Sequence, residues 1–345
     1  MKILFIFWAL LCSSCYSLKQ AYHFTSLYSS KVSVTEALKD DEVPKRIKKR
    51  LRTVIEVNRY ALNEGLNSDG AYASYIHTST ASVSHLVQAA ERDRLKFKTW
   101  WFPFVGTVPY LGFFDKNDRD EKYNDLKKSY DVSKSRVGAF SSLGWFEDPI
   151  YTSMLRSRYQ DLVHLFFHEL VHRTYWSSGS VKFNENLAEF GAEILTAKFL
   201  REKDLDAELS EYFAKKRDKV KYRKWLKSLR ADLKVLYRKR SLGQNEILSR
   251  KENIFKDYRL SKIPNFETKR YSYIKNKKWN NASVLGASLY APDIERFYRA
   301  YRCLGKPSIG DFLKSIEEAE SLYENNFVAL DSFCKPAGQG VADVG

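Results

Sequence analysis

The segment from Leu162 to His172 reads LVHLFFHELVH and is apolar on nearly every side of the helix that its residues favour. Such a helix has no polar face to turn to solvent, so it must lie in the centre of the protein with other elements packed around it. The chain has 345 residues, enough for one large or two modest domains with a buried core. The segment therefore predicts a fold with this helix buried at its centre.

The same helix carries two imidazoles at a spacing that suits a metal ion. Residues four apart share one face of a helix, so His168 and His172 can bind one ion together. Glu169 can act as general base on a water molecule at that ion, which is how metallopeptidases use this motif. With 6 His among the 345 residues, chance gives the motif in roughly 0.5% of sequences. Two hydrogen-bonded core histidines would leave the charge of Glu169 buried and unpaired, which is costly, so we predict a metal site.

A second helix offers the third ligand. Catalytic zinc takes three protein ligands and keeps a fourth position for water. Residues 184–190, NENLAEF, open a helix after a turn, and Glu185 would come back antiparallel to face the two histidines. Glu189 lies one turn further, where it could hydrogen-bond a ligating histidine and fix its tautomer. The reverse assignment, with Glu189 as ligand and Glu185 as support, stays open. We expect His164, one turn before His168, to pack or to support rather than to bind the metal.

The first residues predict export. A charged start is followed by an apolar stretch from Ile3 to Leu11, which is too short to cross a bilayer and is typical of a signal peptide over residues 1–14. Cys15 follows two small residues, as in a lipobox, and would then carry a lipid anchor in the periplasm or cell envelope. A plain signal peptide and an uncleaved anchor are the alternatives. Residues 15–40 would form a tether.

The remaining two cysteines, Cys303 and Cys334, would meet an oxidising compartment after export. A disulfide between them is one interpretation, and two unpaired buried thiols are the other. Their spacing excludes a cysteine zinc cluster.

Periodicity predicts an α+β fold with a helical majority. A helical pattern covers 44–62, aromatic, Gly and Pro residues predict short strands and turns at 99–114 and 135–149, and long helices dominate after Asp161. We expect a single domain at 41–330, with an N-terminal lobe at about 41–160 and a helical C-terminal lobe at about 161–330. A flexible tail would follow at 331–345.

Residues 215–240 are strongly basic. They hold 13 Lys or Arg against Asp218 and Asp232, in a chain of net charge +16. Their apolar residues recur at helical spacing, which predicts a basic helix with one apolar face. Our first interpretation is a helix docked on the core with a solvated basic face. Contact with a membrane surface is the alternative, since each Lys or Arg near anionic lipid contributes about 1 kcal/mol. Export argues against a nucleic-acid partner.

Taken together, HELVH at 168–172 and NENLAEF after eleven intervening residues resemble the gluzincin metallopeptidases, in which a Glu of the second motif is the third zinc ligand. Over nearly the whole chain, the sequence is similar to the bacterial putative aminopeptidase family of exported lipoproteins. The further segments that carry this resemblance are Cys15, WFPFVGTVPYLGFFD at 101–115, SSLGWFEDP at 141–149 and NNASVLGASLY at 280–290.

The resemblance implies a zincin-like core with one Zn²⁺ per chain, bound by His168, His172 and Glu185, and a peptidase that removes amino-terminal residues. An oxyanion donor is also needed, and our candidate is Tyr290, with an ordinary buried tyrosine as the alternative. An envelope endopeptidase with the same site is a second hypothesis. A non-enzymatic basic lipoprotein that holds a membrane through 215–240 is a third.

Overall fold

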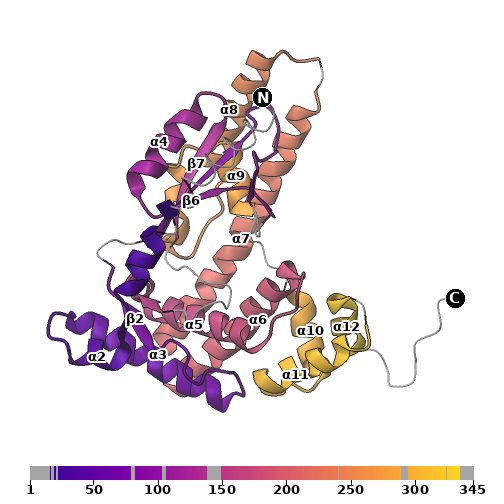
Figure 1. Cartoon of the computed structure of the whole chain (residues 1–345). Coiled ribbons are helices and arrows are strands. Elements are labelled where there is room, and N and C mark those ends of the chain that lie inside the picture. Colours follow the sequence, from indigo (N-terminus) through magenta and orange to yellow (C-terminus); the bar gives the residue numbers. More distant parts are fainter. Residues whose placement is uncertain are drawn as a thin grey trace, which may run out of the picture.

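The computed structural model describes residues 16, 19–20, 22–78, 82–102, 106–137, 149–239, 241–288, 294–323 and 325–334. Over these residues the chain is mainly helical, with small β-sheets beside the helices (Figure 1). The α+β class with a helical majority is therefore confirmed.

Helix α5 (Tyr159–Thr174) lies at the centre of the largest core cluster, as its apolar sequence predicts. Helix α6 (Val181–Glu202) returns along it after a short turn, and α3 (Lys45–Asn63), the helix predicted at 44–62, packs beside it. Gly191 permits the close approach of α5 and α6, because a Cβ there would lie 2.8 Å from Cγ2 of Val171. This tight pairing holds the two motif-bearing helices in one arrangement.

Short elements complete the region around α5. A three-stranded sheet, in the order β1-β2-β8, lies in the chain before α5, and the 3₁₀ helix η1 and further α-helices contribute to the same cluster. These elements are β1 (Val32–Ser33), β2 (Ser74–Ile76), β8 (Ile150–Tyr151), η1 (Met154–Arg156), α2 (Val34–Lys39), α10 (Glu295–Cys303), α11 (Ile309–Glu320) and α12 (Asn326–Ser332).

A second sheet has strand β3 (Ser84–Ala90) at its centre, antiparallel to both β6 (Leu111–Phe113) and β7 (Asp131–Val137). Helix α4 (Lys116–Lys127) packs on it. Strands β4 (Trp100–Phe102), β5 (Gly106–Val108) and β6 confirm the short strands predicted at 99–114. The sequence did not predict β3, because nearly all its side chains are buried and it lacks the alternation of a half-exposed strand.

Helix α7 (Asp206–Tyr237) is long and connects the two regions (Figure 1). Its first half contacts α5 and α6, and its second half packs with α8 (Gln244–Leu260), η2 (Lys269–Lys275) and α9 (Asn281–Ser288). The basic helix predicted at 215–240 is thus present up to residue 237. Its apolar face, with Trp225, Leu226, Leu229 and Leu233, is buried in a second core cluster inside the protein.

Elements that are far apart in the sequence pack against each other in the second sheet region. Helix α9 lies against β3 and β7, so late residues complete the region of the second sheet. Gly286 of α9 approaches β3 closely, because a Cβ there would lie 2.4 Å from Oε1 of Gln88. The expected division into lobes at 41–160 and 161–330 stays a prediction.

The end of the described chain is held in place. Cys303 and Cys334 form a disulfide, and the carboxylate of Asp331 accepts hydrogen bonds from Arg296 and Arg299. Residues 331–334 of the expected tail therefore lie at the end of α12, and 335–345 lie outside the described residues.

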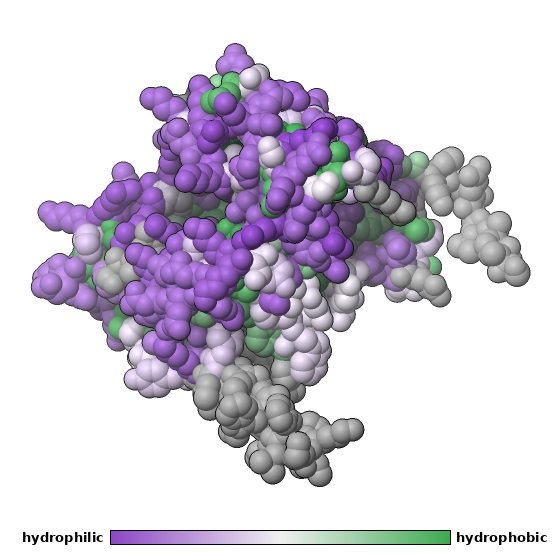
Figure 2. All heavy atoms as spheres, turned by 90° about the horizontal axis from the view of Figure 1, so that it is seen from above, coloured by the Kyte–Doolittle hydropathy of each residue, from purple (hydrophilic) through white to green (hydrophobic). Residues whose placement is uncertain are grey.

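One face of the molecule is mainly polar. The face in Figure 2 is covered mainly by hydrophilic residues, with apolar residues in separate patches. No helix in the described part of the chain is long and apolar enough to cross a membrane.

We expect Asp218→Ala to lower the free energy of unfolding by about 3 kcal/mol. The fully buried Asp218 carboxylate accepts hydrogen bonds from the backbone N–H groups of Glu267 and Thr268, at 2.8 and 2.7 Å, and from the Thr268 hydroxyl. These bonds attach the segment before η2 to α7. Urea denaturation at pH 7 measures the loss. As a control, Asp232→Ala removes a carboxylate of the same helix that is 45% exposed, and should cost less than about 1 kcal/mol.

The Asp218 contribution should also depend on pH. Burial alone would raise the pKa of Asp218, but the hydrogen bonds from Thr268 and Glu267 outweigh it and keep the pKa below its usual value. The stabilisation is therefore present above about pH 4, where the unfolded carboxyl ionises, and is lost as the pH falls through the folded pKa. A difference between wild type and Asp218→Ala that grows on acidification would contradict this account.

Candidate metal centre

Three side chains from α5 and α6 meet at one point. The Nε2 atoms of His168 and His172 lie 3.2 Å apart, and the Glu185 carboxylate lies 3.6 Å from His168 Nε2 and 3.5 Å from His172 Nε2. The two rings are nearly perpendicular, at 86°. The antiparallel pairing of the helices thus brings Glu185 opposite the two histidines.

The spacing of these three groups fits a metal ion. Tetrahedral coordination with ligand bonds of about 2.0–2.2 Å places the ligand atoms about 3.3–3.6 Å apart. The two Nε2 atoms, 3.2 Å apart, are just closer than that range, and the shortest separations to the carboxylate are 3.6 Å from His168 to Oε2 and 3.5 Å from His172 to Oε1 of Glu185. Two imidazole nitrogens and one carboxylate oxygen are also a donor set that transition metals accept. His168, His172 and Glu185 are therefore close enough to hold one ion after small side-chain shifts.

The charge of Glu185 is favoured at this point. The neighbouring imidazoles of His168 and His172 lower the pKa of the Glu185 carboxyl to about 2. Burial lowers the pKa of His168, but Glu185 and the charge of Glu169 more than offset it, so the pKa of His168 lies above its usual value. The site accordingly favours positive charge between the two helices.

Glu169 lies on α5 directly after His168 and is half-buried. Trp176, just beyond the end of α5, is half-exposed, and its ring lies 5.4 Å from that of His172. One side of the histidine pair is thus bordered by an aromatic surface that a substrate side chain could contact.

A second group of potential ligands shares His168. The ligand atoms of His164, His168 and Glu189 all lie within 4.8 Å of one another. His164 Nε2 is 3.4 Å from Glu189, and its Nδ1 lies 2.9 Å from the Tyr212 hydroxyl of α7. Glu189, for which we predicted a hydrogen bond to a ligating histidine, thus faces His164 most directly. This second group keeps the reverse assignment open.

Contacts from α7 were not foreseen from the sequence. Lys219 forms an ion pair with Glu189, and Lys216 forms one with Glu193 one turn further along α6. Burial would raise the pKa of Glu189, but His164 and Lys219 hold it below its usual value. The only signal was the basic composition of the helix, which does not say which lysine meets which carboxylate.

Two predicted site residues cannot be placed. Cys15, the proposed lipid anchor, and Tyr290, the proposed oxyanion donor, lie outside the described residues. The predicted pair Cys303 and Cys334 does lie within the described residues. It forms the disulfide that joins α10 to the residues after α12.

A comparison with protein families gave one match. The family model described as putative aminopeptidase matches residues 15–327. Searches among curated proteins and among solved structures gave no match. The matched range includes α5, α6 and the whole of α7, and therefore both groups of potential metal ligands.

Proposed function

This chain belongs to the putative aminopeptidase family, and from that premise we propose that it is a zinc-dependent metallopeptidase that hydrolyses the N-terminal residues of peptides. The observation that carries the zinc part of the proposal is the His168–His172–Glu185 group, in which the nearest potential ligand atoms of each pair of residues lie 3.2–3.6 Å apart. We further propose that α5 and α6 form a gluzincin-type catalytic core.

In this proposal each residue has a defined task. His168, His172 and Glu185 hold the zinc ion, which when bound supplies a Lewis acid that polarises the scissile carbonyl. Glu169 accepts a proton from the attacking water and returns it to the leaving amine. Tyr290 donates a hydrogen bond to the oxyanion.

The residues around the His168–His172–Glu185 group would fix the orientation of the His168 imidazole. Metal-binding histidines usually depend on a second contact that sets the tautomer and the ring position. Glu189 and His164 lie beside His168, and Lys219 and Tyr212 of α7 in turn contact them. We propose that these four residues position the imidazole of His168 rather than bind the zinc.

We also propose export to the periplasm or cell envelope, with a lipid on Cys15 and membrane attachment. The support is the sequence of residues 1–15, a charged start and a short apolar stretch before a cysteine. The basic helix could add electrostatic attraction to an anionic membrane. Labelling of the expressed protein with a fatty acid, lost in Cys15→Ala, is the direct check.

An aminopeptidase should distinguish free from blocked peptides. We expect zinc-loaded protein to release the first residue of peptides with a free amino terminus and to leave the same peptides intact when they are acetylated. Mass spectrometry of the products gives both the rate and the position of cleavage. Cleavage of acetylated peptides at internal bonds would show the endopeptidase instead, and no cleavage of either set would reject the peptidase proposal.

A further inference from the structure

A groove with a row of cationic side chains lies along α7. It has a volume of about 610 Å³ and is bordered by α7, by Tyr271 of η2 and by Ala287 and Ser288 of α9. This volume is in the range of sites that bind small molecules or short peptide segments. Its five cations are Lys219, Arg223, Lys227, Arg230 and Lys234, and we call it the α7 groove.

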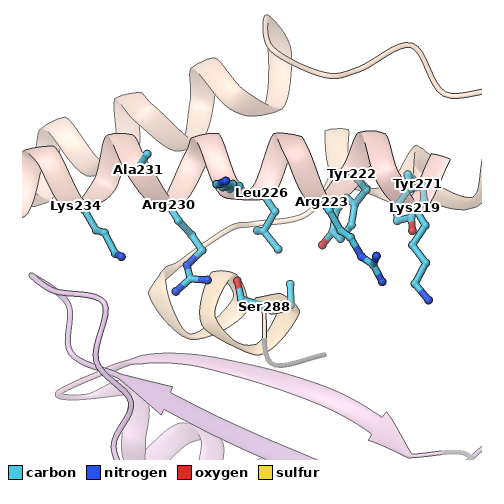
Figure 3. A pocket seen from close by; sticks show the side chains of 11 residues that line it. Lys219, Tyr222, Arg223, Leu226, Arg230, Ala231, Lys234, Tyr271 and Ser288 are labelled. Carbon is cyan, nitrogen blue, oxygen red and sulfur yellow. The ribbon is translucent and has the colours of Figure 1, made fainter. Parts of the chain in front are cut away.

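The five cations share one face of the helix because they are spaced by four, four, three and four residues. Figure 3 shows the labelled side chains of Lys219, Arg223, Arg230 and Lys234 leaving α7 on the same side. Like charges at this spacing repel one another and destabilise a helix. An anionic ligand would relieve that repulsion.

Most of this charge has no carboxylate partner among the residues that the structure describes. Other cations of α7 do have carboxylate partners: Lys215 with Asp161, Lys216 with Glu193, and Arg217 and Lys221 with Glu267. Of the carboxylates that the structure describes, none forms an ion pair with Arg223, Lys227, Arg230 or Lys234. Over the described residues the groove is therefore a concave, positively charged surface on which four of the five cations have no ion-pair partner.

Lys219 links one end of the α7 groove to the second group of potential metal ligands. Lys219 borders the groove and also pairs with Glu189. The Glu189 carboxylate in turn lies within 4.8 Å of the ligand atoms of His164 and His168. The row of cations thus leads away from the site where the peptide bond would be cleaved.

The length of the groove suits an extended peptide. Lys219 and Lys234 are 15 positions apart, or about 22 Å along the helix axis. An extended chain advances about 3.3 Å per residue, so six or seven residues would span this distance. The half-buried ring of Tyr222, which stacks on Tyr271 with ring centroids 4.5 Å apart, adds apolar surface for the chain between its charges.

We propose that the α7 groove binds acidic residues of the peptide substrate on the C-terminal side of the cleaved bond. This inference rests on the proposed peptidase function and adds a substrate class to it: peptides with Asp or Glu after their first residues. A concave groove closed on one side by α9 fits a peptide better than a flat membrane surface, so we favour the peptide over anionic lipid.

The test compares two peptides and two variants of the full chain. Both peptides begin with the same neutral residues, and positions three to six are all Glu in one and all Gln in the other. The groove variant is Lys227→Gln/Arg230→Gln/Lys234→Gln. The control variant, Lys224→Gln/Arg238→Gln/Lys239→Gln, removes equal charge from exposed positions that do not line the groove.

We expect the groove variant to have a KM for the Glu peptide about tenfold above that of wild type. Its kcat for the Glu peptide and its KM for the Gln peptide should be nearly those of wild type. The control variant should behave as wild type, and added salt should remove the preference of wild type for the Glu peptide. A groove variant with an unchanged KM for the Glu peptide, or a control variant with the same loss, would overturn the inference.

A binding measurement separates this inference from the peptidase function. Fluorescence anisotropy of a labelled, N-terminally acetylated Glu peptide reports binding without turnover. Binding that is about tenfold weaker in the groove variant, but not in the control variant, would support the proposed peptide site in the α7 groove. If the same protein cleaves no peptide, the peptidase proposal is rejected while the binding proposal stands. Groove-dependent binding to phosphatidylglycerol vesicles without binding of the Glu peptide would overturn the inference in favour of lipid.

Discussion

Glu169→Gln should reduce peptide hydrolysis by about 10³-fold or more while the protein keeps its metal. The substitution preserves the size of the side chain but removes the carboxylate that would accept the proton of the attacking water. Glu169 lies beside His168 but is not among the three side chains that meet at the ligand point. The measurements are the kcat for release of the first residue and the metal content by mass spectrometry.

The metal content distinguishes a catalytic from a structural effect. An inactive Glu169→Gln protein with about one zinc per chain has lost only the general base. Thermal unfolding of this variant should match that of wild type, since a folding defect would lower both metal content and melting temperature. Unchanged hydrolysis by zinc-loaded Glu169→Gln would reject the mechanism.

His168→Ala should lose the metal entirely, because His168 belongs to both groups of potential ligands. His172→Ala and Glu185→Ala should also bind little zinc, since each removes one of three protein ligands. His164→Ala and Glu189→Ala should retain zinc with an affinity lowered by about 10–100-fold, the usual effect of losing a residue that orients a ligand. Zinc titration with a competing chelator measures all five affinities.

The opposite pattern would change the assignment. If His164→Ala and Glu189→Ala abolish zinc binding while His172→Ala and Glu185→Ala retain it, the second group is the metal site and Glu185 has the supporting role. Retention of stoichiometric metal by all five variants would exclude both groups.

Local sequence predicted much of the helical part of this protein. The positions of α3, α5 and the basic part of α7 follow from apolar residues at helical spacing, which depends only on neighbours in the chain. The shared orientation of His168 and His172 was also predictable, because a spacing of four residues is enough to place both on one face of α5. The α+β class and the short strands β4, β5 and β6 were predictable for similar reasons.

The candidate metal ligands could also be predicted from the sequence, but the contacts between them could not. The Glu185 carboxylate lies 3.5–3.6 Å from the imidazoles of His168 and His172, but the choice between Glu185 and Glu189 as metal ligand stays a prediction. It depends on the relative rotation of α5 and α6. That rotation depends on close packing, including the approach of α6 to Val171 at Gly191.

What the sequence by itself determined, then, is the set of local elements and the chemistry of the side chains they carry. Only the tertiary structure decided that β3 is the centre of a sheet, that Lys219 meets Glu189, and that a row of cations on α7 borders a groove. The physical reason is that these features join residues distant in sequence, so they depend on how whole surfaces pack together and not on the preference of any one segment.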